Sequence, residues 1–246
     1  MIELRGKRVI ISGASSGIGL VTAQMLADAG AEVGLVARRA DALEAAVTTV
    51  GGSSWGLPCD VSDPQSVRAL FEEASNRWGA VDGLVNNAGV APMATLDDTT
   101  TEVWDEAFAV NVRGPFLVCR EFGPLLALGS SPAVVNVSST LAERAIPGMA
   151  AYNSSKAALN QLTRSLALEW APRVRVNAVM PAVVDTPIHA TRGMSSKEVQ
   201  EMGSIHPLGR VGQPDDVATA IAFLLSDASS WMTGAIIPVD GGMMAG

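Results

Sequence analysis

The segment that decides the fold is residues 8–19, RVIISGASSGIG, close to the amino terminus. Its first five residues form an apolar, β-branched run typical of a buried strand, and a helical pattern extends from Ser16 to Gly30. Between them lie three glycines, Gly13, Gly17 and Gly19. Glycines at this place allow a tight turn and let the backbone approach a pyrophosphate held at the helix N-terminus. The segment therefore predicts a strand-turn-helix unit that binds a dinucleotide.

The alternation of strand and helix continues to the end of the chain. Further strands are expected at 32–36, 54–59, 81–86, 133–138, 174–179 and 235–239. Further helices are expected at 41–50, 64–78, 101–127, 151–170 and 214–226. Most of the strand segments are apolar throughout, as in strands buried on both faces, and crossovers between parallel strands are right-handed. The pattern predicts an α/β fold: a Rossmann-type doubly wound sheet of about seven parallel strands, with helices on both faces.

No linker, repeat or low-complexity segment divides the chain, so we expect a single dinucleotide-binding domain over residues 1–246. One stretch, residues 182–213, has no clear period and contains Pro187, Gly193, Gly203 and Pro207. A loop of that length inside a compact domain is usually functional. We expect it to form a substrate lid.

Composition and charge exclude several classes of function. The net charge of −8 offers no basic field for nucleic acid, anionic lipid or an acidic carrier protein. Cys59 and Cys119 lie in apolar stretches and are expected to be buried thiols, without a role in a disulfide or a metal site. The amino terminus lacks a signal-peptide pattern and no apolar run is long enough to span a bilayer. We expect a cytoplasmic protein without membrane or nucleic-acid partners.

Three motifs follow one another in a specific order: glycines spaced Gly-x3-Gly-x-Gly, then residues 86–89 (NNAG), then Tyr152-x3-Lys156. The combination resembles the short-chain dehydrogenase/reductase family, and residues 181–187 and 239–242 extend the resemblance to the end of the chain. Ala182 departs from it, because the family usually has glycine there. The resemblance implies an oxidoreductase that interconverts a ketone or aldehyde and a secondary alcohol by hydride transfer.

The end of the second strand indicates which cofactor is used. An acidic residue there would bind the ribose 2′-hydroxyl of NAD, whereas arginine accommodates the 2′-phosphate of NADP. The sequence has Ala37 at that place, followed by Arg38 and Arg39, and therefore predicts NADP(H). A solvated arginine pair is the alternative. By resemblance the cofactor contacts Gly13, Ser15, Ser16, Gly17, Ile18, Gly19, Arg38, Arg39, Asp60, Val61, Asn87, Ala88, Gly89, Tyr152, Lys156, Pro181, Val184 and Thr186.

Tyr152 and Lys156 are four residues apart, which places both side chains on one face of a helix. The pKa of a free phenol, about 10, must fall by roughly 2–3 units for catalysis near neutral pH, and a nearby ammonium favours the phenolate. By resemblance, Tyr152 is the general acid and base, and Ser139, thirteen positions earlier, binds the substrate carbonyl oxygen, which leaves Ser138 a structural role. Asn111 matches the family's asparagine that anchors a water next to the lysine; the alternative is that Asn111 bends its helix.

The substrate is less well defined by the sequence. Expected pocket residues, besides Ser139 and Tyr152, are Thr140, Leu141, Met149, Val183, His189, Met194, Met202 and Ile205. They predict a mostly apolar pocket for an uncharged small-molecule ketone or alcohol. His189 and His206 have no partners at metal-ligand spacing, so no metal is expected.

Two alternatives remain open at this point. One is a 3-oxoacyl reductase acting on a carrier protein or thioester, and the other is an NADP-binding sensor or structural subunit without turnover. The resemblance also implies a homotetramer, with helices 101–127 and 151–170 at subunit contacts.

Overall fold

The computed structural model describes residues 2–245. A single sheet forms its centre, with strands β1 (Arg8–Ser12), β2 (Glu32–Ala37), β3 (Trp55–Pro58), β4 (Gly83–Asn86), β5 (Ala133–Val137), β6 (Arg175–Pro181) and β7 (Ile236–Val239). All neighbouring strands are parallel, in the order β3-β2-β1-β4-β5-β6-β7. The order reverses direction between β1 and β4. The prediction of a doubly wound sheet of seven parallel strands is confirmed.

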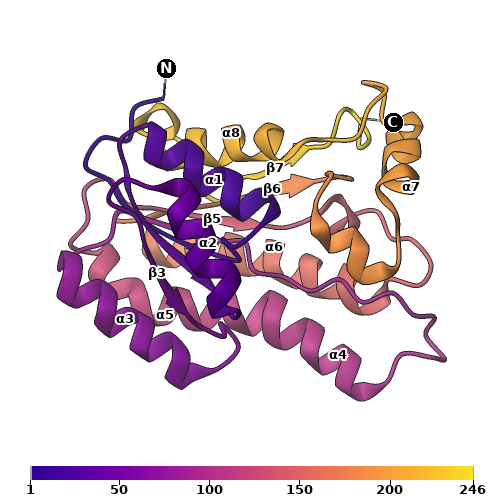
Figure 1. Cartoon of the computed structure of the whole chain (residues 1–246), viewed down its shortest axis with the longest axis horizontal. Coiled ribbons are helices and arrows are strands. Elements are labelled where there is room, and N and C mark those ends of the chain that lie inside the picture. The colour runs from indigo at the N-terminus through magenta and orange to yellow at the C-terminus, as the bar shows by residue number, and fades with distance from the viewer. Residues whose placement is uncertain (1, 246) are drawn as a thin grey trace.

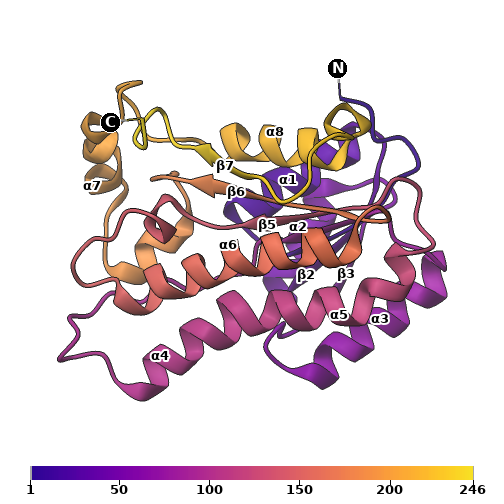
Figure 2. The same ribbon diagram turned by 180° about the vertical axis from the view of Figure 1, so that it is seen from behind.

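Helices cover both faces of this sheet (Figures 1 and 2). They are α1 (Gly17–Asp28), α2 (Ala40–Val50), α3 (Pro64–Trp78), α4 (Thr101–Phe108), α5 (Gly114–Leu126), α6 (Ala150–Trp170), α7 (Ser196–Glu201) and α8 (Pro214–Leu225). One apolar core joins the sheet to α1, α2 and α8, and the other joins it to α3, α5 and α6. Among residues 2–245, no helix has both the length and the apolar character needed to cross a membrane.

Successive residues of the central strands alternate between the two cores. In β1, Ile10 belongs to the core with α3 and α5, whereas Ile11 belongs to the core with α1 and α8. In β4, Leu84 belongs to the core with α3 and α5, and Val85 belongs to the core with α1 and α8. Because side chains in a strand alternate faces, a strand covered on both sides must be apolar at every position. Burying each such side chain stabilises the fold by about 1.5–3 kcal/mol.

The helix expected at 101–127 is interrupted. A π-helical turn over Ala109–Arg113 separates α4 from α5, and buried Asn111 lies within it. The Asn111 amide nitrogen donates to the Val90 carbonyl and to the Ser155 hydroxyl, both at 2.9 Å. These bonds draw the widened turn toward the loop after β4. The helix is therefore locally deformed at Asn111, as the alternative interpretation of this residue expected, and such π-turns are frequent at functional sites.

The stretch at 182–213 has more regular structure than expected. It contains a 3-10 helix at Pro187–Arg192, then α7, then a second 3-10 helix at Met202–Ile205. Helix α7 begins with a capping box, in which the Ser195 hydroxyl and the Glu198 carboxylate each bind the other residue's backbone N–H. The Ser-x-x-Glu pattern of such a box is visible in the sequence. The short helices are stabilised by caps and packing, which a search for long periodic segments does not detect.

Both cysteines are buried free thiols, as predicted. Burial raises the pKa of the Cys119 thiol to about 12, so this thiol is unreactive at neutral pH.

Candidate functional site

A cavity of about 710 Å³ lies at the carboxyl ends of the strands, where parallel α/β sheets bind ligands. It brings together the turn after β1, the ends of β2, β4, β5 and β6, part of α6 and the short helices of residues 187–205. Of the residues expected at the site, it is lined by Gly13, Ser15, Ser16, Gly17, Ile18, Arg38, Arg39, Asp60, Val61, Asn87, Ala88, Gly89, Ser139, Thr140, Leu141, Tyr152, Lys156, Pro181, Val183, Val184, Thr186, His189, Met194, Met202 and Ile205.

Three of the expected residues do not line the cavity. Gly19 is inside α1, and Asn111 is buried in the π-helical turn. Met149 was expected in the substrate pocket but is 1% exposed and packs with Ala91 and Tyr152 in a small apolar cluster. It supports the tyrosine from the protein interior, because the chain turns into α6 at this residue.

The glycine turn packs closely against the loop that follows β4. Gly13 has a φ of +66°, and a Cβ atom at this residue would lie 2.8 Å from the Ala88 Cα. The Asn87 side-chain amide donates to the carbonyls of Ser12 (3.0 Å) and Gly13 (3.1 Å). A Cβ on Gly19 would collide with the Gly13 carbonyl oxygen. Only glycine allows these backbones to approach so closely.

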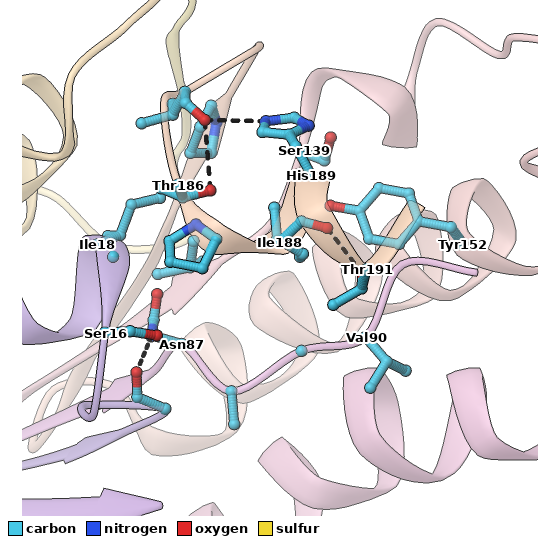
Figure 3. Close-up of a pocket in the computed structure, with 18 of the residues that line it drawn as sticks. Ser16, Ile18, Asn87, Val90, Ser139, Tyr152, Thr186, Ile188, His189 and Thr191 are labelled. Atoms are coloured by element: carbon cyan, nitrogen blue, oxygen red, sulfur yellow. Dashed lines mark hydrogen bonds between the residues drawn. The ribbon is translucent and has the colours of Figure 1, made fainter. Parts of the chain in front are cut away.

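The first turn of α1 is left open toward the cavity. Ser16, the residue that precedes the helix, makes no side-chain capping bond, and the first turn contains no acidic residue. Ser16, Gly17 and Ile18 all line the cavity (Figure 3). Uncapped N–H groups and the positive end of the helix dipole favour an anion at this place. The turn thus fits the pyrophosphate of a dinucleotide. A nicotinamide dinucleotide bound there would supply the chemistry of hydride transfer.

Arg38 and Arg39 are exposed at the end of β2 and border the far end of the cavity. The Asp60 carboxylate lies near them and accepts hydrogen bonds from the backbone and hydroxyl of Ser62, at 2.9 and 2.7 Å. Burial alone would raise the pKa of Asp60, but the Ser62 hydrogen bonds and the Arg38 charge lower it. This end of the cavity thus combines two arginines with an ionised acid.

Tyr152 and Lys156 project from α6 and are buried, with 8% and 4% of their surface exposed. The Lys156 ammonium donates to the Val137 carbonyl at the end of β5, at 2.8 Å, and lies 5.8 Å from the centre of the Tyr152 ring. Ser139 lies beside Tyr152, on the opposite side of the cavity from Ser16 and Ile18 (Figure 3). The neighbouring Ser138 hydroxyl donates instead to the Lys156 carbonyl, at 3.3 Å.

The pKa values of this pair differ from the expectation based on spacing. Burial raises the pKa of the Tyr152 phenol, and the neighbouring Ser139 hydroxyl and Arg192 guanidinium oppose that increase only in part. Burial also lowers the pKa of Lys156 to about 8. Lys156 is thus only partly charged above neutral pH, and its ammonium is directed to Val137. Desolvation therefore outweighs the expected effect of the lysine, and the phenol is protonated at neutral pH.

The side chain of Asn111 connects three elements around this pair. Besides its two donor bonds, its carbonyl oxygen accepts from the Val90 backbone N–H at 2.9 Å. Its oxygen and the Lys156 nitrogen both lie close to Gly89, where a Cβ would come within 3.2 and 3.5 Å of them. Asn111 thus holds the loop after β4 against α6. Its role in anchoring a water stays a prediction.

His189 contributes a hydrogen-bond acceptor to the cavity wall. Its Nε2 lies 2.9 Å from the Val184 carbonyl, which can only accept, so Nε2 carries the proton. Its buried Nδ1 has no hydrogen-bond partner within residues 2–245. Burial lowers the pKa of His189, and the imidazole is neutral at pH 7. No cluster of three or more metal-binding side chains occurs in the described part of the chain.

The structure adds cavity residues that the sequence did not indicate. Among them are Val90, Ile146, Ile188, Thr191, Arg192 and Met243. Arg192 is the most informative, because its guanidinium carbon lies 5.5 Å from the centre of the Tyr152 ring. Its Nε donates to the Ala91 carbonyl at 3.0 Å. In the sequence, only the position of Arg192 within the expected lid could have suggested that it lines the cavity.

Comparison with known proteins agrees with this arrangement. Residues 13–244 match a family model described as enoyl-(acyl carrier protein) reductase. The crystal structure of a short-chain type dehydrogenase/reductase from Mycobacterium marinum superposes with a TM-score of 0.92, at 32% identity, and covers 100% of this chain and 98% of that one. The chain belongs to the short-chain dehydrogenase/reductase family. As such it is an oxidoreductase that acts on alcohol or ketone groups with a nicotinamide cofactor.

Two relatives within the short-chain dehydrogenase/reductase family match along nearly their full length. Cis-4-hydroxycyclohexanecarboxylate dehydrogenase of Sinomonas cyclohexanicum is 39% identical over 250 residues, which cover all of both chains. D-threitol dehydrogenase of Mycolicibacterium smegmatis is 35% identical over 244 residues, which cover 98% of this chain and 94% of that protein.

Proposed function

We propose that this protein is an NADP(H)-dependent oxidoreductase that interconverts a ketone or aldehyde and a secondary alcohol, with Tyr152 as the general acid and base. The observation that carries the proposal is the meeting of Ser139, Tyr152 and Lys156 on the wall of the cavity that also contains the open N-terminus of α1. Both named relatives are dehydrogenases of hydroxyl compounds, which supports the same chemistry here.

In the reductive direction, the substrate carbonyl oxygen accepts hydrogen bonds from Tyr152 and Ser139. A bound nicotinamide cofactor would supply the hydride that the carbonyl carbon accepts. Because burial keeps the Tyr152 phenol protonated, it can donate its proton to the oxygen as negative charge develops there. Lys156, held by Val137, would contact the nicotinamide ribose. In the oxidative direction the ionised form of Tyr152 accepts the alcohol proton, so the raised pKa of the phenol favours oxidation at high pH.

The preference for NADP rests on the end of β2. Ala37 supplies no carboxylate for a ribose 2′-hydroxyl, while Arg38 and Arg39 border the cavity with exposed guanidinium groups that match a phosphate. We expect Arg38→Ala to weaken NADPH binding about 10- to 100-fold and to leave NADH binding unchanged, because one charged hydrogen bond contributes about 1.5–3 kcal/mol. Fluorescence titration with each cofactor measures this, and equal effects on both would refute the assignment.

Tyr152→Phe tests the proposed chemistry. The substitution removes one hydroxyl and keeps the ring that packs on Met149 and Ala91. NADPH oxidation with a panel of ketones, aldehydes and 3-oxoesters should fall below a few per cent of the wild-type rate, while NADPH binding is retained. Turnover near the wild-type level would exclude Tyr152 as the acid.

A carrier-protein or thioester substrate is the second candidate, because the matching family model is described as a carrier-protein reductase. The loop before β5, residues 128–132, contains no basic residue for an acidic carrier. Including a 3-oxobutanoyl thioester in the same panel decides between the two. NADPH binding without turnover of any compound would favour a sensor or structural subunit.

We also propose that the protein assembles as a homotetramer through α4, α5 and α6. Phe116 on α5 is 41% exposed and Leu168 on α6 is 82% exposed, so these helices present apolar side chains that a subunit contact would bury. Light scattering of the purified protein measures the mass directly, and a monomer at micromolar concentration would refute this assembly.

A further inference from the structure

The side of the cavity near Tyr152 contains a charged group to which the proposed reaction assigns no contact with the substrate or the cofactor. Arg192, at the end of the 3-10 helix Pro187–Arg192, lines the cavity and is half-buried. Its guanidinium lies against the face of the Tyr152 ring, 5.5 Å from the ring centre. A substrate whose oxygen is bound by Tyr152 must therefore lie close to this arginine.

The hydrogen-bonding capacity of Arg192 is mostly unused within the protein. An arginine side chain has five N–H donors. Within residues 2–245 only Nε has a partner, the Ala91 carbonyl, at 3.0 Å. Neither terminal nitrogen makes a hydrogen bond or an ion pair with any residue from 2 to 245. A half-buried cation in this state is costly unless a ligand pairs with it.

No negative charge on the cavity wall can neutralise the Arg192 guanidinium. Asp60 is the only carboxylate among the described lining residues, and it lies at the adenosine end near Arg38. Two other basic side chains lie on this side of the cavity: His189 is neutral, and the Lys156 ammonium donates to the Val137 carbonyl. The remaining lid residues that face this region are apolar or hydroxylated: Ile188, Thr191, Met194, Met202 and Ile205. An arginine in such surroundings selects an anion.

We infer that Arg192 binds a carboxylate of the substrate, so that the enzyme acts on a hydroxy acid and the corresponding oxo acid. This inference rests on the proposed function and revises the expectation of an uncharged substrate. The planar guanidinium can hold a carboxylate through two parallel hydrogen bonds. Since the same residue lies over the Tyr152 ring, the carboxylate and the reacting carbonyl belong to one compact molecule. Arg192 would thus determine specificity and orient the carbonyl toward Tyr152.

The kinetic test compares an acid with its neutral ester. The probes are 4-oxopentanoate and methyl 4-oxopentanoate, and the variants are Arg192→Ala, Arg192→Lys and the control Arg173→Ala, whose side chain is exposed and outside the cavity. We expect kcat/KM for the acid to exceed that for the ester about tenfold or more in the wild type and the control. Arg192→Ala should remove this preference and affect the ester less than threefold, whereas Arg192→Lys should restore part of it.

A binding test separates this inference from the proposed reaction. Pentanoate and pentanamide are titrated calorimetrically into the protein saturated with NADP⁺. Pentanoate should bind about tenfold more tightly than pentanamide, and Arg192→Ala should abolish the difference. Equal binding of the two, or an equal loss of acid and ester turnover in Arg192→Ala, would make Arg192 a structural contact of the lid and overturn the inference. Arg192-dependent pentanoate binding without turnover of any carbonyl would refute the reaction and retain the anion site.

Discussion

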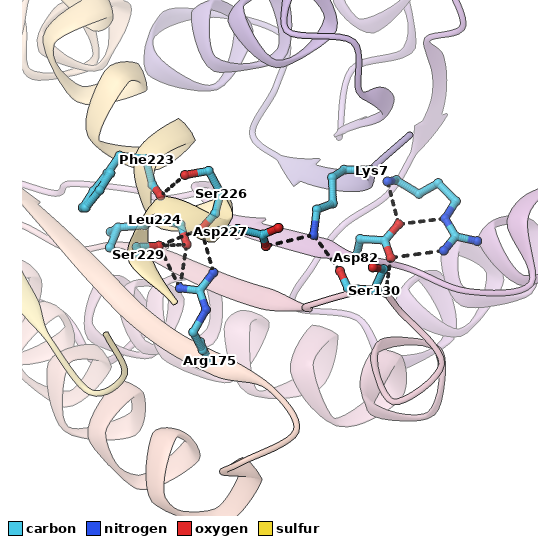
Figure 4. A network of polar contacts seen from close by, with 10 residues as sticks. Lys7, Asp82, Ser130, Arg175, Phe223, Leu224, Ser226, Asp227 and Ser229 are labelled. Carbon is cyan, nitrogen blue, oxygen red and sulfur yellow. Dashed lines mark hydrogen bonds and ion pairs between the residues drawn. The ribbon is translucent and has the colours of Figure 1, made fainter. Parts of the chain in front are cut away.

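Replacing Asp82 with alanine removes the central acceptor of a polar network at the amino ends of the central strands, whereas the cavity lies at their carboxyl ends (Figure 4). The side chain of Asp82 is 1% exposed and accepts from the Arg8 backbone (2.9 Å), from Arg8 Nε (2.8 Å) and Nη2 (3.1 Å), and from the Ser130 backbone (2.6 Å). These bonds join the starts of β1, β4 and β5. The variant leaves the Arg8 guanidinium, whose side chain is 24% exposed, without its carboxylate.

Removing one partner of a buried pair lowers the free energy of unfolding by about 3–5 kcal/mol, and we expect the lower end of this range here. The Arg8 charge is partly exposed, but the Arg8 and Ser130 backbone donors lose their acceptor. For a chain of this length, that corresponds to a decrease of roughly 10 °C in the unfolding temperature. Thermal and urea unfolding, followed by circular dichroism, measure the change. Glu72→Ala is the matched control, since Glu72 pairs with Arg68 on the surface, where side chains are about 60% exposed, and should change stability by less than about 1 kcal/mol.

The effect of Asp82→Ala should depend on pH in a defined direction. Burial would raise the pKa of Asp82, but the hydrogen bonds from Arg8 and Ser130 lower it below the unfolded value of about 3.9. A carboxyl group with a lowered folded pKa stabilises the protein above the unfolded pKa, and this contribution is lost as the pH falls through the folded value. The loss in the free energy of unfolding caused by Asp82→Ala should therefore be complete at pH 7 and become smaller below pH 4. A deficit no larger than that of Glu72→Ala at pH 7 would refute the reasoning, as would a large loss of activity in the folded variant.

Three further substitutions or conditions test the site. Gly19→Ala places a Cβ against the Gly13 carbonyl oxygen, and cofactor affinity in a fluorescence titration should fall more than tenfold; an unchanged affinity would show that the turn can adjust. Ser139→Ala should lower kcat about 100-fold or more, as loss of an oxyanion donor does, whereas Ser138→Ala should lower it much less; the reverse order would exchange their roles. Because Lys156 has a lowered pKa of about 8 and becomes neutral above it, reductive kcat/KM should decline as the pH rises past 8, and a kcat/KM that stays constant to pH 10 would contradict a role for its charge.

The sequence predicted the parts of the site that depend on local structure. The glycine turn follows β1 directly, and the spacing of Tyr152 and Lys156 places both on one face of α6. The buried strands were recognisable because a strand between two helix layers is apolar at every position. These features require only a short segment and a known periodicity.

Features that depend on tertiary packing were not predictable in this way. The pKa of Tyr152 is governed by how deeply α6 is buried, and spacing carries no information on burial. Met149 lies three positions before Tyr152 in the sequence but faces the interior, whereas Arg192 and Met243 reach the cavity from distant segments. The π-helical turn at Asn111 depends on bonds to Val90 and Ser155, which no local pattern encodes.

The cavity draws its reacting groups and its substrate-facing groups from different parts of the chain. Ser139 and Tyr152 come from the end of β5 and from α6, whereas Arg192 and the apolar residues Ile188, Met194, Met202 and Ile205 come from residues 182–205. The second segment lies between β6 and α8 and consists mainly of short helices. Evolution or directed mutagenesis can therefore replace it piecemeal and create a new substrate range, while inheriting the hydride-transfer apparatus unchanged.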